Sequence, residues 1–491
     1  MKNFAEAMKY ESTKTFTENG AFAYNSTMND LVDLFACIGA LRSRKEKDIE
    51  AKFARAFAND KLFATKMLFY CGDIRNGGLG ERRTFRVCLK WLANNHPEIV
   101  KKNIHNIPYY NRFDSLFVLV GTPCEKEMWE FVNKILTSDI SEVVKAKKEN
   151  RKPNISLLGK WMPSENASSK ETKRLARKAM CALGLTPRIY RLTLSILRKN
   201  LDVTEVKMSA KEWNKIHYEF VPSYAMRKYS NAFLKHDKTR FEQYMKDLND
   251  KTKNVKINSS TLYPYDLIHD VMKGKNLTVK EQWNSLPNYV EGKNDILVMA
   301  DVSGSMYGRP LETSIGLAIY FAERNQGQFH NLYMSFSSDP NFIAIHDTDS
   351  LNKKVEQLVH TQIGFSTNLE KAFLRILGIA VKYHMKDEEL PKALCVISDM
   401  EIDRYIERNG LDFVNTMRER FKSYGFTLPK LILWNVEARN DTFLTQSKDV
   451  IKVSGQSASV FKRLCGNLNG KTDYEFMIET LNNKAYDAVV I

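Results

Sequence analysis

The spacing of apolar residues changes near residue 295, and this change most constrains how the chain can fold. Residues 295–300 form an apolar run of strand length, and an amphipathic helix is expected from about Pro310 to Arg324. Further strand candidates at 332–336, 393–397 and 431–434 alternate with helical candidates at 351–359, 368–383 and 410–423. Fully apolar strands alternating with helices predict a parallel sheet covered by helices on both faces.

The preceding half of the chain has a helical period instead. Between about Met28 and Tyr244, apolar residues recur at helical spacing in stretches cut by turn signals such as Asn76-Gly77-Gly78. Such helices can pair and stack into a repeat solenoid, although no exact repeat period is present. Because 491 residues exceed a single core, we expect a helical repeat domain at 1–250, a linker and packing segment at 251–293, and an α/β domain at 294–491. Helical pieces such as 264–272 can pack within the linker.

The positive charge of the chain lies in its first part. Residues 1–290 carry 51 Lys and Arg against 32 Asp and Glu, whereas residues 291–491 carry 23 against 26. Residues 151–200 alone hold 12 basic side chains and only two acidic ones. This density favours a polyanionic partner such as nucleic acid, and the alternative is that the lysines only keep a large protein soluble.

The cysteines and the chain start indicate a reducing compartment. Seven cysteines are widely spaced and form no C-x-x-C pair, which is typical of buried thiols rather than of zinc ligands or disulfides. Residues 1–16 lack an apolar signal region, and no stretch approaches 18 consecutive apolar residues. We therefore expect an unanchored cytoplasmic protein.

The first predicted strand is followed at once by Asp301, Ser303 and Ser305. In an open α/β sheet, ligands bind outside the carboxyl ends of the strands. One carboxylate and two hydroxyls at alternate positions of a tight loop can face one centre. Such hard oxygen ligands suit Mg²⁺ best, with Mn²⁺ or Ca²⁺ as alternatives, and do not suit zinc. The competing interpretation is a turn that only caps the following helix.

This arrangement resembles the metal-ion-dependent adhesion site (MIDAS) of von Willebrand factor type A (vWA) domains, which have a doubly wound, Rossmann-like fold. Residues 364–368 supply the later threonine of that pattern, Thr367, and residues 396–401 supply its aspartate, Asp399. The resemblance implies a metal bound by Asp301, Ser303, Ser305, Thr367 and Asp399, with a further position for an acidic partner residue or solvent. Glu401 and Asp403 either add charge near this centre or form a solvated loop.

A basic helical half followed by such a domain resembles the Ro autoantigen, which gives the RNA-binding TROVE module its name. It resembles more closely an uncharacterised vWA-bearing family of plants, protists and large viruses. The matching stretches are 73–82, 91–97, 159–166 and 211–244. The resemblance implies HEAT-like repeats that can close into a ring and that bind single-stranded or structured RNA in a ribonucleoprotein. The motif around residue 80 is the strongest shared element.

Several basic residues are candidates for RNA binding. Gly77, Gly78 and Gly80 permit a sharp turn whose amides and neighbouring arginines could seat a phosphate. The alternative is a structural turn between helices, with Arg82 paired to a carboxylate such as Asp114. Tyr190 and Trp161 could stack on bases, or lie in the core. The candidates are Arg75, Arg82, Arg83, Lys160, Lys170, Lys173, Arg174, Arg177, Lys178, Arg188 and Arg191.

Three functions follow from these features. The first is a Ro-like RNA-binding scaffold whose metal site binds a protein partner. The second is a metal-dependent protein-interaction scaffold without RNA. An enzyme is the weakest of the three, because the sequence has neither a Ser/His/Asp order nor a second metal cluster, and His330, His346 and His384 have no spacing that converges on the metal.

Overall fold

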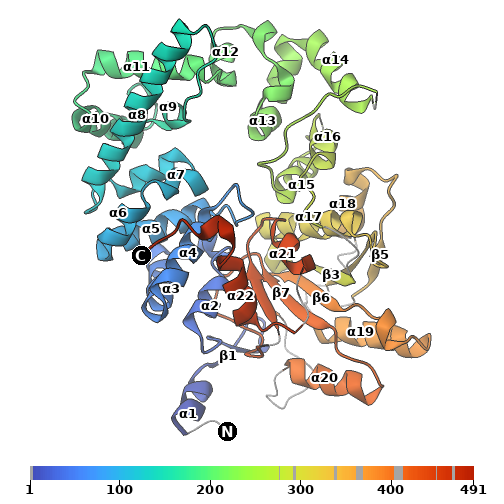
Figure 1. Cartoon of the computed structure of the whole chain (residues 1–491). Helices are drawn as coiled ribbons and strands as arrows, with labels where there is room; N and C mark the ends of the chain where they lie inside the picture. Colours follow the sequence, from blue (N-terminus) through green and yellow to red (C-terminus); the bar gives the residue numbers. More distant parts are fainter. Residues whose placement is uncertain are drawn as a thin grey trace. The chain divides into compact units, whose positions relative to one another are not determined.

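The computed structural model describes residues 4–250, 252–275, 277–290, 295–336, 340–360, 369–402, 413–448, 450–466 and 470–491. The chain forms two compact units (Figure 1). The α/β unit comprises residues 1–73, 77–84 and 259–487, and the helical unit comprises 74–76, 85–258 and 488–491. None of the helices described is long and apolar enough to cross a membrane.

The α/β unit is built on a six-stranded sheet in the order β5-β4-β3-β6-β7-β8. All neighbouring strands are parallel except β5, which pairs antiparallel with β4. The mostly parallel sheet confirms the prediction from the apolar runs, while the short edge strands β5 and β8 were not predicted. The strands are β3 (Ile296–Asp301), β4 (Leu332–Phe336), β5 (Phe342–Ala344), β6 (Ala393–Ser398), β7 (Lys430–Asn435) and β8 (Ile451–Ser454).

Helices cover both faces of this sheet. Alternate strand residues such as Leu297 and Leu433 join one core cluster with residues of α19 (Leu369–Lys382) and α20 (Phe413–Ser423). Trp434 packs on the opposite face against Phe461 of α21 (Val460–Gly466), and Phe461 also contacts Phe321 of α17 (Arg309–Arg324). The strands carry apolar residues on both faces because helices bury both faces of the sheet. The remaining helices are α18 (Leu351–His360) and α22 (Asp473–Leu481).

The first 73 residues pack with the α/β unit, so the expected boundary at residue 250 differs from the structure. Gly39 lies directly on Gly455, and its amide donates to Ser454 Oγ at 3.0 Å, which covers edge strand β8. An uncovered edge strand would expose unpaired backbone groups, which gives a physical reason for this packing. The segment contains α1 (Phe4–Ser12), β1 (Lys14–Phe16), β2 (Phe22–Tyr24), α2 (Asp30–Phe35), α3 (Glu46–Asn59) and α4 (Lys61–Gly72).

Most of the expected linker also belongs to the α/β unit. Residues 259–290 contain α15 (Pro264–Met272) and α16 (Val279–Asn284), and Leu267 and Ile268 are fully buried. A Cβ on Gly316 of α17 would lie 3.1 Å from Pro264, so α15 and α17 pack closely at this glycine. Helix α15 confirms the helical piece expected at 264–272, whereas the polar composition of the segment concealed α16.

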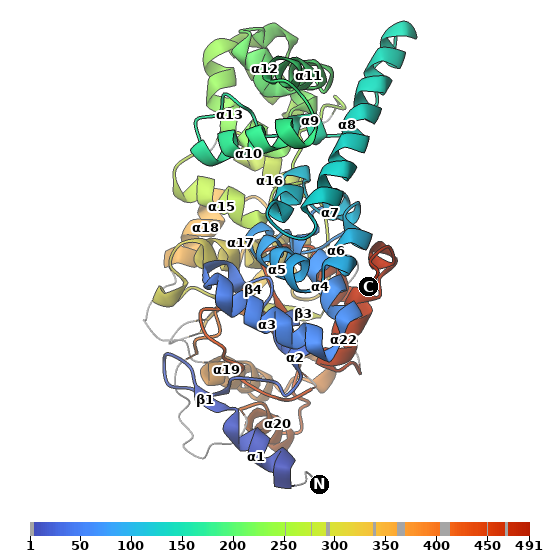
Figure 2. The ribbon, with the colours of Figure 1, turned by 90° about the vertical axis from the view of Figure 1, so that its left-hand side faces the viewer.

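The helical unit contains no strand among its described residues, in agreement with the predicted helical period (Figure 2). Helices α10 and α11 are joined by the turn at 183–186, and α13 packs against α14. The repeat and ring architecture stays a prediction. The helices are α5 (Arg82–Asn95), α6 (Pro97–Asn103), α7 (Asn106–Tyr110), α8 (Glu125–Lys148), α9 (Leu158–Trp161), α10 (Lys170–Ala182), α11 (Pro187–Asn200), α12 (Thr204–Ser209), α13 (Ser223–His236) and α14 (Lys238–Asn249).

Candidate functional site

Asp301 is the last residue of β3 and is completely buried. Strand β3 lies between β4 and β6, so the chain leaves it first toward one side of the sheet and later toward the other. This is the topological switch point at which open α/β sheets bind ligands. The sequence therefore places a carboxylate where the fold is suited to a ligand.

Two hydrogen bonds hold the Asp301 carboxylate. The Ser303 amide donates to Oδ1 at 2.9 Å, and Ser398 Oγ donates to Oδ2 at 2.5 Å. Ser303 Oγ and Ser305 Oγ are 3.1 Å apart. The loop thus brings two hydroxyls together beside a fixed carboxylate, as the D-x-S-x-S spacing predicts.

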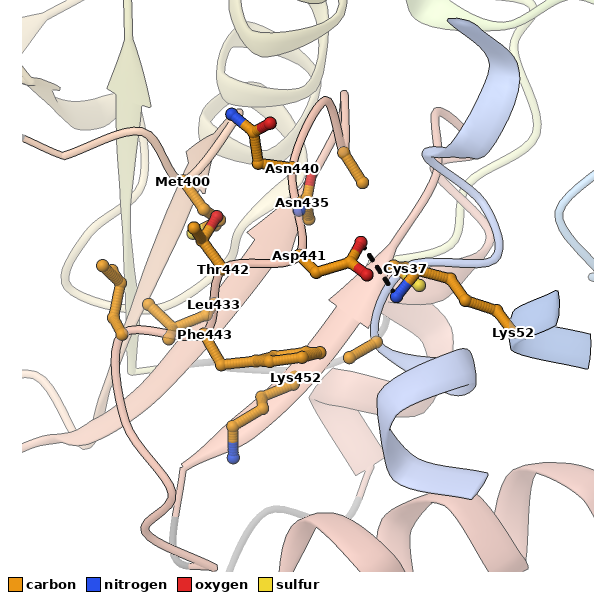
Figure 3. A pocket seen from close by; sticks show the side chains of 13 residues that line it. Cys37, Lys52, Met400, Leu433, Asn435, Asn440, Asp441, Thr442, Phe443 and Lys452 are labelled. Carbon is orange, nitrogen blue, oxygen red and sulfur yellow. Dashed lines mark ion pairs between the residues drawn. The ribbon is translucent and has the colours of Figure 1, made fainter. Parts of the chain in front are cut away.

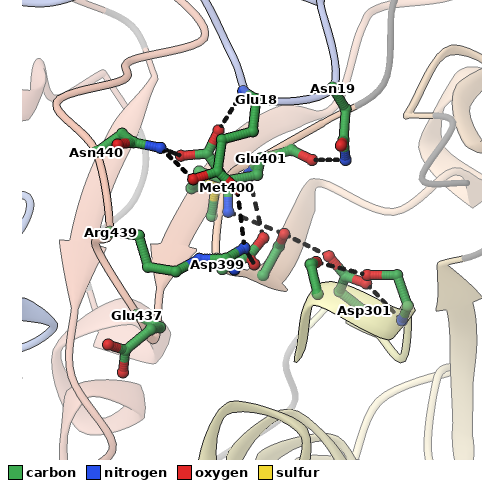
Figure 4. Close-up of polar contacts among 12 residues, drawn as sticks. Glu18, Asn19, Asp301, Asp399, Met400, Glu401, Glu437, Arg439 and Asn440 are labelled. Atoms are coloured by element: carbon green, nitrogen blue, oxygen red, sulfur yellow. Dashed lines mark hydrogen bonds and ion pairs between the residues drawn. The ribbon is translucent and has the colours of Figure 1, made fainter. Parts of the chain in front are cut away.

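Asp399 follows the neighbouring strand β6 and is also buried. Its Oδ1 accepts the Glu401 amide at 3.1 Å, and its Oδ2 accepts the Arg439 guanidinium at 2.5 Å (Figure 4). Burial, together with the nearby charge of Asp399, raises the pKa of Asp301 to about 7. Two neighbouring buried carboxylates are thus only partly neutralised by the protein itself.

This donor set fits a hard divalent cation. Two carboxylates and two hydroxyls supply oxygen ligands, and a cation would relieve the repulsion between Asp301 and Asp399. The fifth predicted ligand, Thr367, lies outside the described residues. Within the described ranges, neither this centre nor any other place groups three His, Cys, Asp or Glu side chains that could hold a metal, so the hydroxyls have to supply the remaining protein ligands here.

Glu401 is buried and anchors the tip of the β1–β2 hairpin, so the solvated-loop interpretation is wrong for this residue. Its Oε2 accepts the Glu18 amide at 2.7 Å, and its carbonyl accepts Asn19 Nδ2 at 2.6 Å. Burial raises the pKa of Glu401. Asp403 lies outside the described residues.

Arg439 is a residue that sequence reasoning missed. It lies in the loop after β7, and its guanidinium bridges Asp399 and Glu18, the latter at 3.6 Å. A single arginine among several in the chain carries no local signal for this role. Only the packing of the N-terminal hairpin beside the carboxyl ends of β6 and β7 brings the three side chains together.

A small cavity of the α/β unit adjoins this centre, since it is lined by Met400 and Asn440, the chain neighbours of Asp399 and Arg439 (Figure 3). It has a volume of about 20 Å³ and is lined in part by Cys37, Lys52 and Asp441. Lys52 Nζ is 3.0 Å from Asp441 Oδ1, and burial raises the pKa of the Cys37 thiol to about 11. The cavity has room for about one water molecule, so it is not a substrate site.

None of the seven cysteines forms a disulfide, as expected. Five are buried, Cys465 is half-buried, and Cys181 is exposed.

The glycine-rich turn uses its amides internally, which contradicts the predicted phosphate seat. The amides of Leu79, Gly80 and Glu81 donate to the carbonyls of Tyr70, Asp73 and Cys71. A Cβ on Gly78 would lie 2.5 Å from the Tyr70 carbonyl oxygen, and Gly80 has a φ of +67°. The glycines therefore serve a tight turn.

Asp114, the carboxylate suggested as a partner for Arg82, contacts Arg112 and Arg86. Two of the arginines around the turn donate hydrogen bonds to backbone carbonyls. Arg75 donates to the carbonyls of Pro108, Tyr109 and Asn111, and Arg83 donates to those of Arg42 and Arg44. Arg75, Arg82 and Arg83 are all exposed.

Helix α10 presents a cationic face to solvent. Ala176, Ala179 and Met180 are buried on one side, while four cations on the other side are exposed: Lys170, Arg174, Arg177 and Lys178. Of these four, Lys178 alone has an ion pair within the described part of the chain, at 3.9 Å from Glu125. Lys173 is half-buried. The helix thus carries a strip of charge with little internal compensation.

Helix α11 continues this basic surface with exposed Arg188 and Arg191. Arg191 forms an ion pair with Glu165 at 2.6 Å. Tyr190 is buried and donates its hydroxyl to the Pro163 carbonyl at 2.7 Å, so it belongs to the core and cannot stack on a base. Trp161 is half-buried beneath the Arg112 guanidinium, 3.8 Å from the ring centre, with Lys160 farther away at 5.6 Å.

These units define a protein with a basic helical region and a mostly parallel α/β domain. Two family models match it, both described as domains of unknown function: DUF2828 at residues 17–111 and 167–296, and DUF7788 at 295–487. Neither description refers to Ro or vWA proteins. The junction of the two matches coincides with the change of apolar period near residue 295.

The chain is also similar to a protein of Acanthamoeba polyphaga mimivirus with the name Uncharacterized protein L728. The two are 29% identical over 486 residues, which cover 91% of this chain and 84% of the relative. The similarity therefore spans both units.

Proposed function

We propose that this protein is a Ro-like RNA-binding scaffold, in which the helical unit binds RNA and a vWA-type domain recruits a partner protein through a divalent metal, most readily Mg²⁺. The observation that carries the RNA proposal is the cationic face of α10. Four exposed cations on one helix face, extended by α11, suit a phosphate backbone. Cysteines that form no disulfide support a reducing compartment such as the cytoplasm.

The metal proposal is supported by the carboxylates and hydroxyls at the switch point of the sheet. Asp301, Ser303, Ser305 and Asp399 would hold the ion, with Thr367 completing the set by analogy with the vWA pattern. The ion would offer a position to an acidic side chain of a partner. No step of a reaction is assigned to this site.

Filter binding at two salt concentrations tests the RNA proposal. Triple charge reversal of Arg174, Arg177 and Lys178 should weaken RNA binding at low salt by at least tenfold and flatten its salt dependence, because each phosphate contact contributes about 0.9 to the slope on duplex and about 0.7 on single strands. Charge reversal at Lys235, Lys238 and Lys246 is a matched control on α13 and α14. Equal loss in both variants would indicate general electrostatics, and unchanged binding in the α10 variant would refute this assignment.

The second candidate is a metal-dependent interaction scaffold without RNA. The buried carboxylate pair favours it, since that site does not depend on the helical unit. A pull-down that requires Mg²⁺, fails for Asp301→Ala, and carries no nucleic acid by its absorbance ratio at 260 and 280 nm would support this candidate. Co-purifying RNA would favour the first.

A further inference from the structure

Arg439 lies beside the candidate metal centre and contacts one of its aspartates. Its guanidinium is the only cation among the described residues that contacts Asp399, and one of its nitrogens lies 2.5 Å from Asp399 Oδ2. A second carboxylate, Glu18, lies 3.6 Å from the same nitrogen. Arg439 is therefore placed between an aspartate of the centre and a glutamate of the N-terminal hairpin (Figure 4).

The present position of Arg439 leaves part of the guanidinium unsatisfied. Its Nε is buried and makes no hydrogen bond to any residue that the structure describes. A buried donor without an acceptor is costly. The contact with Asp399 thus stabilises the arginine, but its guanidinium lacks a full set of hydrogen bonds that would fix its position.

Glu18 is held rigidly enough to act as an alternative partner. Its amide donates to Glu401 Oε2 at 2.7 Å, and its own Oε1 accepts Asn440 Nδ2 at 2.6 Å. Thr17 Oγ1 donates to the Ile402 carbonyl at 2.6 Å. The hairpin tip is thereby held to residues 401 and 402, which lie two and three positions after Asp399.

We propose that Arg439 is an exchangeable counter-ion of the centre, which pairs with Asp399 when no cation is bound and shifts to Glu18 when a divalent cation binds. The physical reason is that a cation next to Asp399 repels the guanidinium, and Glu18 is the other carboxylate within 4 Å of it among the described residues. The N-terminal hairpin therefore responds to metal occupancy. This inference rests on the proposed metal site.

The test combines metal affinity with hydrogen exchange in the full-length protein. Mn²⁺ and Mg²⁺ are titrated by calorimetry into the wild type and into Arg439→Gln. We expect the variant to bind the metals about tenfold more tightly or better, because the positive charge that pairs with Asp399 and repels the incoming cation is removed. Arg439→Lys, which keeps the charge, should bind closer to the wild type.

Hydrogen exchange of residues 13–25 reports the hairpin. Mg²⁺ should change exchange there in the wild type, and this response should be lost in Glu18→Gln and in Arg439→Gln. Glu437→Gln is the matched control, because this glutamate lies in the same loop and accepts a hydrogen bond from Ser43 rather than from the Arg439 side chain. It should leave both affinity and response unchanged.

The outcomes separate the two proposals. Binding in the wild type that is lost in Asp301→Asn, but unchanged in Arg439→Gln, would retain the metal site and overturn the exchange of Arg439. Failure of both the wild type and Arg439→Gln to bind either metal would overturn both. Weak wild-type binding that strengthens in Arg439→Gln would support both.

Discussion

Gly39 sets how closely the N-terminal segment approaches the sheet. A Cβ at this position would lie 2.7 Å from the Gly455 Cα and N atoms, both of them backbone. Neither atom belongs to a flexible side chain that could move aside. A residue with no side chain is therefore required for the segment to cover edge strand β8.

We predict that Gly39→Ala lowers the stability of the α/β unit by about 1–3 kcal/mol, the usual cost of overpacking a filled site. Gly378→Ala is the control. Gly378 lies inside helix α19, and nothing is within 4 Å of the added Cβ, so its replacement should be neutral or stabilising by up to about 1 kcal/mol. Thermal unfolding measures both, and equal melting temperatures for Gly39→Ala and wild type would contradict the close approach.

The pair of buried carboxylates is a residue-scale feature that the sequence predicts well. Asp301 and Asp399 each follow an apolar strand directly, and parallel strands end at the same edge of a sheet. Arg439, in contrast, follows a strand at some distance along a loop. Its contact with Asp399 depends on the course of that loop, which no local pattern specifies.

At the scale of elements, Asp114 joins α5 to the 3₁₀ segment at 113–119. The Arg86 guanidinium lies 2.8 Å from Asp114 Oδ2, and Arg112 donates to Oδ1 at 2.9 Å. Burial raises the pKa of Asp114, but the two arginines outweigh it and hold the pKa below its ordinary value of 3.8. The folded helical unit therefore favours the ionised carboxylate.

A carboxyl group whose pKa is lowered by folding contributes stability above its unfolded pKa, and this contribution is lost as the pH falls through the folded pKa. We predict that Asp114→Asn destabilises the helical unit at pH 7 and that the difference from wild type shrinks below about pH 4. Urea unfolding at several pH values measures it. A difference that is constant with pH would show that the ion pairs do not carry the effect.

Element prediction succeeded where the apolar period was long. Helices α17 and α18 and strands β3, β4, β6 and β7 lie within a residue or two of the expected ranges. The helical piece expected at 264–272 coincides with α15, whereas the short strands β1, β2, β5 and β8 and helix α16 were missed, because three to six residues give too few repeats of a period.

At the scale of the whole molecule, the two units provide separate sites for the two proposed ligands. A ligand stabilises only the structure that binds it, by about 2.7 kcal/mol at a concentration of 100 times its Kd. We predict that Mg²⁺ raises the melting temperature of the α/β unit and that RNA raises that of the helical unit. Calorimetry of the full chain, with Asp301→Asn and the α10 charge-reversal variant as controls, measures this. A shift of one common transition by either ligand would contradict independent units.

The sequence by itself determined the helical and α/β regions, the parallel sheet, and the carboxylate and hydroxyls at its switch point, since these depend on residue periodicity and on chain-local spacing. Only the tertiary structure decided that residues 1–73 complete the α/β unit and that Arg439 lies between Asp399 and Glu18. It also decided that the amides of the glycine-rich turn donate to carbonyls at the end of α4 and at Asp73. The turn donates its amides to carbonyls only seven to ten residues earlier, but the other two features depend on contacts between residues tens to hundreds of positions apart. Such contacts are selected by the packing of the whole core, which no window of sequence contains.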